Sequence, residues 1–337
     1  MQPYANVFFD FFPRLHYQFR FPVHRCADLW PIPKRETIPF ADTKKGNYSL
    51  DTLRRQIDEI DDQVHDLLMR RIDVARKIGT RKNHEQNTAY RPAREAQILR
   101  RLAARHSEPF PFKTVVKIWR EIISASLAAE ENFVVSVYVP EPLVAGLAYV
   151  ALARTYFGTD TLILQAQTEA GVLRAVRDGK ASVGVLPITS DTQTERASAE
   201  PWWYTLTASG SERPHIVAVM PWLNDGNAGA NATRAMVVAR LQPEASGEDI
   251  SVIAFESTED ISRDRIRREA ENAGLALDWA ATWTEVDQAR RWQLAEIDGF
   301  VSETDRRLGI LINALDQEVT RFINLGCYAK PAKVAKS

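Results

Sequence analysis

Cysteine is scarce in this sequence of 337 residues, which contains only Cys26 and Cys327. Two thiols so far apart form neither a disulfide framework nor a cysteine-based metal motif, and such scarcity is typical of a reducing cytoplasm. Uninterrupted apolar segments are short, so the sequence predicts no membrane-spanning helix. We therefore expect a cytoplasmic protein that does not associate with membranes.

An excess of charge of either sign is also missing. The 43 Lys and Arg residues nearly balance the 44 Asp and Glu residues, which leaves a formal net charge of −1. No overall field favours nucleic acid or an anionic membrane as a partner. With 45% hydrophobic and 26% charged residues, the composition is typical of a globular protein, and the length predicts two or three domains.

The first 48 residues lack a periodic apolar face and are rich in aromatic residues, Arg and Pro. The segment has neither the basic start nor the apolar block of a signal peptide, and it has few serines for a transit peptide. We expect residues 1–48 to be a disordered extension, or the product of a misassigned start codon.

A long amphipathic helix is predicted over residues 49–83, with Ser49 as its N-cap. Its apolar positions alternate in steps of four and three, which keeps them on one helix face. This stripe consists of Leu53, Ile57, Ile60, Val64, Leu67, Val74 and Ile78, with Arg71 at one of its positions. A helix of this length predicts a coiled-coil-like or intertwined partner. Two further helices are predicted, at about 92–106 and 112–132.

Charged and polar side chains occupy apolar positions in all three helices. They are Arg54, Arg71, Lys82, Arg94, Glu95, Ser126 and Glu130. Buried charges need partners, which an internal network of salt bridges can provide. However, only two carboxylates are available for four cations. This deficit favours an absent anionic ligand with two carboxylates, which arginine binds in a bidentate manner.

From Phe133 onward the pattern alternates between strands and helices, which predicts an α/β region with a partly parallel sheet. From about residue 250 to 330 the expected order is β-α-β-β-α-β, the ferredoxin-like pattern. The predicted divisions are 1–48, 49–132, 133–249 and 250–330, with a tail at 331–337.

The segments "LDTLRRQIDEIDDQVHDLLMRRIDVARKIGTRK", "YRPAREAQILRRL" and "IWREIISASLAAEE" resemble the all-helical class of chorismate mutase. They are most similar to the mutase module of bifunctional chorismate mutase–prephenate dehydratases, over residues 49–132. The resemblance implies an all-α module in which two three-helix chains intertwine as a homodimer. One departure is Arg91, which stands where some members carry an aspartate.

The resemblance also implies the reaction, a pericyclic conversion of chorismate to prephenate without a nucleophile, metal or cofactor. The site must hold the reactive conformer and stabilise negative charge on the ether oxygen. By position, the matching substrate-binding residues are Arg54 (reaching the partner's site), Arg71, Arg94 and Ser126. The matching catalytic residues are Lys82 and Glu130 at the ether oxygen and Glu95 at the ring hydroxyl.

The second half resembles a degenerate prephenate dehydratase lobe, 133–249, followed by a degenerate ACT-like domain, 250–330. The stretches "VPEPLVAGLA" and "TSD" (Thr189 to Asp191) replace family motifs, as does Ala235 after Thr233 and Arg234. Only about forty residues separate Asp191 from Thr233, too few for a second α/β lobe. We expect no dehydratase activity, because fold likeness alone does not carry function.

Two other functions remain open at the level of sequence. An isochorismate pyruvate lyase uses the same helical class and the same carboxylate-binding cations. The second alternative is a non-catalytic regulatory or scaffold dimer, which the departure at Arg91 favours. The degenerate half is expected to stabilise the dimer, or to dock another enzyme of the shikimate pathway.

Overall fold

The computed structural model describes most of the chain from Ser49 onward. The described residues are 49–83, 89–141, 143–188, 200–208, 210, 213–224, 233–258, 261–284 and 290–333. The predicted N-terminal extension, the "TSD" stretch and the last residues of the tail lie outside them. The chain divides into two compact units, Met1–Asp61 and Asp62–Ser337, and the boundary between them falls within the first helix.

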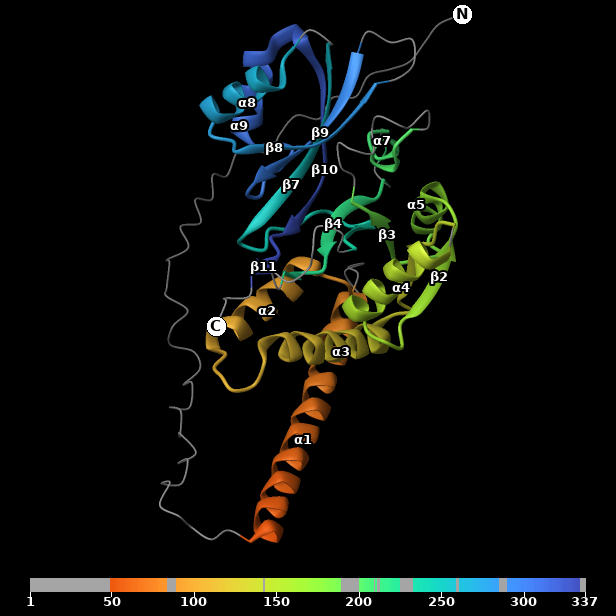
Figure 1. Ribbon diagram of the computed structural model, residues 1–337, viewed down its shortest axis with the longest axis vertical. Coiled ribbons are helices and arrows are strands. Elements are labelled where there is room, and N and C mark those ends of the chain that lie inside the picture. The colour runs from red at the N-terminus through yellow and green to blue at the C-terminus, as the bar shows by residue number, and fades with distance from the viewer. Residues whose placement is uncertain are drawn as a thin grey trace, which may run out of the picture. The chain divides into compact units, whose positions relative to one another are not determined.

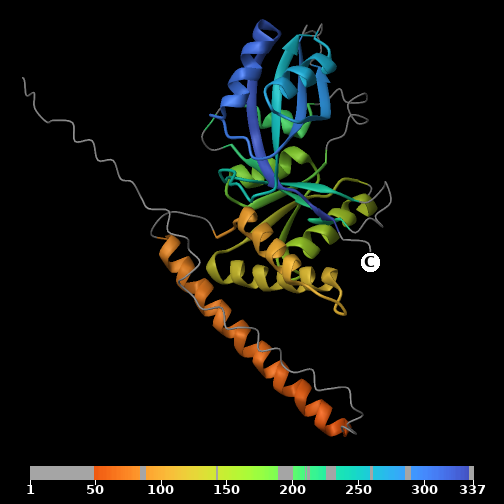
Figure 2. The same cartoon turned by 90° about the vertical axis from the view of Figure 1, so that its left-hand side faces the viewer.

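The three predicted helices are present with nearly the predicted bounds. They are α1 (Leu50–Asn83), α2 (Pro92–Arg105) and α3 (Phe112–Glu130). The Ser49 hydroxyl accepts a hydrogen bond from the Thr52 amide, at 3.2 Å, so Ser49 does cap α1. Pro92 occupies the first turn of α2, where a missing N–H costs nothing. Helices α2 and α3 lie side by side (Figure 2).

The described part of the unit that begins at Asp62 also contains a mixed sheet of nine strands (Figure 1). Its order is β2-β1-β3-β6-β4-β10-β7-β9-β8. The first part contains β1 (Val134–Tyr138), β2 (Leu162–Ala166), β3 (Val183–Pro187), β4 (His215–Met220) and β6 (Ala235–Ala239). Strand β1 is parallel to β2 and β3, whereas β6 is antiparallel to β3 and β4. The predicted partly parallel sheet is therefore present.

Two helices follow the parallel strands, α4 (Leu143–Phe157) and α5 (Glu169–Arg177). Between β3 and β6 the described residues form a short helix, α7 (Trp202–Thr205), and strands β4 and β5 (Leu223–Asn224). Strand β4 joins the main sheet, and β5 pairs with β11 (Ala332–Lys333). The described part of this segment thus extends the first lobe and builds no second one.

The C-terminal part has the predicted ferredoxin-like order. Its elements are β7 (Asp249–Thr258), α8 (Arg263–Asn272), β8 (Leu277–Thr284), β9 (Arg290–Asp298), α9 (Arg306–Leu315), the 3-10 turn η1 (Asp316–Glu318) and β10 (Val319–Ala329). Both helices contact each other beside the strands (Figure 1). The part pairs with the first lobe in the sheet at Gly326 of β10 and Ile216 of β4. The two also share a buried cluster that includes Met236 of β6 and Val252 of β7. Strands from before and after the predicted domain boundary at 249/250 therefore belong to one sheet. The boundary itself stays a prediction.

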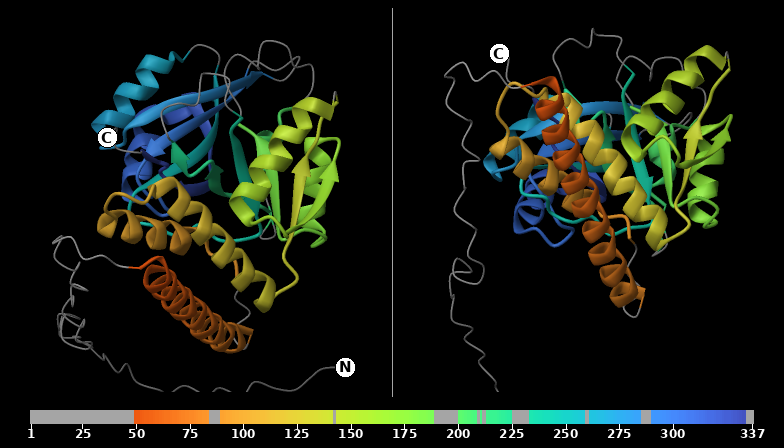
Figure 3. Two further views of the ribbon diagram at one scale, coloured as in Figure 1. Left: turned by 60° about the horizontal axis from the view of Figure 1, so that its bottom comes forward. Right: turned by 90° about the horizontal axis from the view of Figure 1, so that it is seen from below.

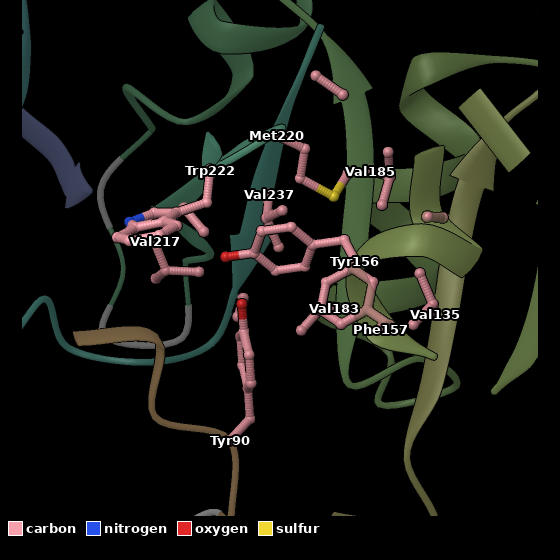
Figure 4. Packing of buried hydrophobic residues seen from close by; sticks show 14 of the residues in the cluster. Tyr90, Val135, Tyr156, Phe157, Val183, Val185, Val217, Met220, Trp222 and Val237 are labelled. Carbon is pink, nitrogen blue, oxygen red and sulfur yellow. The ribbon is translucent and has the colours of Figure 1, made fainter. Parts of the chain in front are cut away.

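One hydrophobic core extends from the helices into the sheet. Leu99 of α2 and Ile123 of α3 belong to the same buried cluster as Val135, Val183 and Val237 of the strands. Figure 4 shows the strand side of this cluster, with Tyr90 and Tyr156 pointing toward each other. Helix α3 also packs against α4 (Figure 3). The predicted boundary at 132/133 thus crosses a continuous core, and it stays a prediction.

Candidate active site

Arg71, at an apolar position of α1, points to α3 and is half-buried. One guanidinium nitrogen, Nη1, donates to the Ser126 hydroxyl at 2.6 Å and to the Ile122 carbonyl at 3.4 Å. Burial lowers the pKa of Arg71, and the Glu130 carboxylate opposes that shift. The predicted Arg71, Ser126 and Glu130 therefore lie together, on facing sides of α1 and α3.

Gly79 permits this close approach of the two helices. A Cβ at position 79 would lie 2.9 Å from Cγ of Glu130, which is closer than side-chain atoms normally pack. Glu130 is partly buried, and its Oε2 has almost no contact with solvent. The carboxylate is thus held at a helix junction, one turn after Ser126 on α3.

The other two cations predicted on α1 are Lys82 and Arg54. Lys82 belongs to α1, but its side chain lies outside the described part of the chain. Arg54 belongs to the unit Met1–Asp61, where it is exposed and its Nη1 is 3.4 Å from the Asp51 carboxylate. Their predicted roles stay predictions.

Helix α2 presents to the core a face that overlaps the expected one in part, since Glu95 and Leu102 are buried as predicted and Arg94 is not. The sequence pattern placed Arg94 and Glu95 together on a buried face with Ile98. In the structure Arg94 is exposed, and its Nη1 lies 3.4 Å from the amide oxygen of Gln97. The buried face is centred on Glu95, Leu99 and Leu102. The helix carries two adjacent apolar stripes, and the one packed on the sheet is rotated away from Arg94.

Glu95 is 6% exposed and is bound by an arginine that the sequence interpretation missed. Arg120 Nη1 donates to Glu95 Oε2 at 2.6 Å. Arg120 is itself 4% exposed, and its guanidinium carbon lies 3.7 Å from the ring centroid of Tyr156 in α4. Burial raises the pKa of Glu95, whereas the charge of Arg120 opposes that rise. The structure therefore separates Glu95 and its arginine from Arg94.

A detectable signal for Arg120 exists in the sequence. It lies four residues after Val116 and three before Ile123, both of which are buried. This is the same spacing that singled out Arg71 within its own apolar stripe. The sequence pattern instead predicted that the neighbouring stripe, with Trp119 and Ile122, is the buried face. In the structure those two residues are only partly buried.

Arg91, the departure from the family pattern, has a partner of its own. Its Nη2 lies 2.7 Å from Oε1 of Glu244, and its Nε also donates to that carboxylate. Both side chains are 48% exposed. Arg91 therefore connects the start of α2 to the loop after β6.

Other kinds of site are not found in the described ranges. No cluster of three or more His, Cys, Asp or Glu side chains there is arranged to hold a metal ion. Nor do those ranges include a helix that is both long and apolar enough to cross a bilayer.

The helical region is similar in sequence to known proteins. Residues 53–131 match the family described as chorismate mutase type II. A bifunctional chorismate mutase/prephenate dehydratase from Pseudomonas aeruginosa is 32% identical over 43% of this chain and 40% of its own length. The chain thus spans about two fifths of the length of that curated relative.

Two solved structures are similar over 60% of this chain. One is described as a novel type of quorum quenching acylase, with 17% identity, a TM-score of 0.42 and 96% of that chain covered. The other is prephenate dehydratase from Streptococcus mutans, with 13% identity, a TM-score of 0.39 and 100% covered. The resemblance drawn from the helical motifs is confirmed by the family match: residues 53–131 are a chorismate mutase type II domain.

Proposed function

We propose that this chain converts chorismate to prephenate in aromatic amino acid biosynthesis. The observation that supports this most directly is the contact of Arg71 with Ser126, beside Glu130. An arginine at an apolar helix position is costly to bury. Here Arg71 donates to the Ser126 hydroxyl of α3 and lies near the charge of the Glu130 carboxylate. A guanidinium group binds a substrate carboxylate well.

The reaction breaks a C–O bond and forms a C–C bond within one molecule, so the protein supplies orientation and charge. Arg71 and Ser126 would hold a carboxylate and select the folded conformer. Lys82 and a protonated Glu130 would stabilise the ether oxygen as it becomes negative. Arg94 and the partner subunit's Arg54 would bind substrate carboxylates, and Glu95 would accept the ring hydroxyl.

The proposal includes an intertwined homodimer formed through α1. In the part of α1 after Asp61, the stripe residues Val64, Leu67, Val74 and Ile78 are between 47% and 59% exposed. A continuous apolar stripe along a helix favours a second helix as its partner. A dimer would cover the stripe and bring Arg54 of one chain to the site of the other.

We also propose that the α/β region has no dehydratase activity. A site between two lobes needs a second lobe, and the described residues between β3 and β6 add strands to the first lobe. The family motifs are replaced as well. Docking of another shikimate-pathway enzyme on this region and a cytoplasmic location stay predictions.

The test is chorismate consumption by the purified protein, with the products identified. Arg71→Ala should abolish turnover, because it removes the cation that binds the carboxylate. Arg70→Ala is the matched control, since Arg70 is the neighbouring residue on α1 and is exposed. Prephenate formation that only Arg71→Ala abolishes supports the proposal.

The same assay separates the alternatives. Release of pyruvate from isochorismate without turnover of chorismate would identify a lyase. Phenylpyruvate formed by the protein alone would contradict the absence of dehydratase activity. If neither chorismate nor isochorismate reacts, the result favours the non-catalytic scaffold, and Arg71 belongs to a structural network.

A further inference from the structure

Glu95, a residue matched to the mutase site, is held by the α/β region through two other side chains. Arg120 of α3 donates to its carboxylate at 2.6 Å. The Arg120 guanidinium is stacked on Tyr156, which belongs to α4. All three side chains are buried. A continuous line of contacts thus leads from the first helix of the α/β region to Glu95.

The surroundings of Tyr156 in this line are buried and aromatic. Tyr90, just before α2, points toward Tyr156 (Figure 4). The ring of Phe157 packs against both tyrosines, with centroid distances of 5.9 Å to Tyr90 and 4.9 Å to Tyr156. An ion pair in such an environment is weakly screened, so the position of each charge strongly depends on the other.

Further polar contacts attach α2 to the α/β region. Arg91 pairs with Glu244. Arg100 donates to the Ser246 hydroxyl at 2.9 Å and to the Glu248 carbonyl at 2.6 Å. Helix α2 is therefore held at two places by the segment between β6 and β7, as well as through the shared core.

We propose that Arg120 and Tyr156 are positioning residues for the mutase reaction, through which the α/β region sets the orientation and ionisation of Glu95. This inference rests on the proposed mutase function. Arg120 occupies Oε2 of Glu95, and a carboxylate has further acceptor sites for a substrate hydroxyl. The α/β region is then part of the mutase and not an independent remnant.

The charge of Arg120 makes the proposal testable by pH. Glu95 is buried, and Arg120 opposes the effect of burial on its pKa. Without Arg120 the carboxylate should take up a proton at neutral pH, since an unpaired buried charge is costly. Activity lost in this way returns as pH rises and Glu95 ionises. Activity lost by general disorder does not return.

The experiment measures kcat and KM for chorismate on the full-length protein from about pH 5 to about pH 9. A carboxyl group whose pKa is raised by burial titrates within this range. Arg120→Met should lower kcat/KM at neutral pH by about 100-fold, because a buried carboxyl without a partner can have its pKa raised by several units. The ratio of this value to that of the unsubstituted protein at the same pH should rise as pH increases, so the separate effect of Glu130 cancels. Lys117→Met is the control, because Lys117 is exposed on the same helix and should leave the profile unchanged.

Two Tyr156 variants cover the case in which Arg120→Met fails to fold. Tyr156→Leu removes the ring face and should reproduce the loss and its pH dependence to a smaller extent. Tyr156→Phe keeps the ring and should restore most of the activity. A uniform loss at all pH values, or no loss in either Arg120→Met or Tyr156→Leu, would overturn the inference while the mutase function stands. An unsubstituted protein that does not turn over chorismate would overturn both.

Discussion

Gly326→Ala should destabilise the protein by disturbing the pairing of β10 with β4 in the main sheet. Gly326 forms the one residue pair that joins β10 to β4, at a point where the register of β10 against β7 shifts. A Cβ there would lie 2.0 Å from the Ile216 carbonyl oxygen and 2.6 Å from the Ile216 nitrogen. The backbone φ is +142°, a conformation that alanine rarely adopts.

The magnitude follows from two terms. A non-glycine residue at such a φ costs about 1–3 kcal/mol. Moving β4 away from β10 disrupts at least one buried backbone hydrogen bond, for about a further 1–3 kcal/mol. We therefore expect the free energy of unfolding to fall by about 2–6 kcal/mol from these terms together.

Urea unfolding followed by tryptophan fluorescence measures this change, since the chain has eight Trp residues. Gly309→Ala is the matched control. Gly309 lies inside α9, and a Cβ there would meet nothing within 4 Å. That substitution should stabilise the protein by about 1 kcal/mol, through helix propensity. A loss in free energy of unfolding below about 1 kcal/mol would mean that the backbone around Gly326 accommodates a Cβ, and it would refute the prediction.

Three further outcomes are expected. Leu99→Ala should lower the free energy of unfolding by about 2–5 kcal/mol, because Leu99 is 0% exposed in the shared core; an unchanged urea midpoint would contradict this. Mutase activity should fall as pH rises above the acidic range, because an ionised Glu130 repels the developing oxyanion, and Glu130→Gln should remove that dependence; a flat profile in the unsubstituted enzyme would be evidence against it. Burial and Arg213 hold the pKa of His215 below 6.5, so the unfolded chain binds the proton first as pH falls. The free energy of unfolding should therefore decrease as pH drops below about 6.5, less steeply in His215→Gln; equal slopes in urea titrations at several pH values would refute it.

Much of the fold could be predicted because its elements carry strong local patterns. The three-and-four spacing from Leu53 to Ile78 indicated α1 almost to the residue. The strand–helix order after Asp249 indicated the ferredoxin-like part. The pairing of Gly326 with Ile216 could not be predicted, because one bridge between distant segments leaves no periodic signal in either of them.

The candidate site was predictable only where one stripe stood out. Arg71 interrupts a single apolar stripe, so its direction toward Ser126 could be expected. Helices α2 and α3 each carry two neighbouring stripes, and periodicity alone does not say which one meets the sheet. For that reason Arg94 was assigned to the buried face and Arg120 was overlooked.

The shared core has a consequence for how such a chain can change over evolutionary time. Deletion of the strands would leave Leu99, Val116 and Ile123 without the side chains that now cover them. Exposure of that surface would cost stability at once, whether or not the strands take part in any reaction. Selection for stably folded α2 and α3 is therefore sufficient to retain the α/β region that covers them.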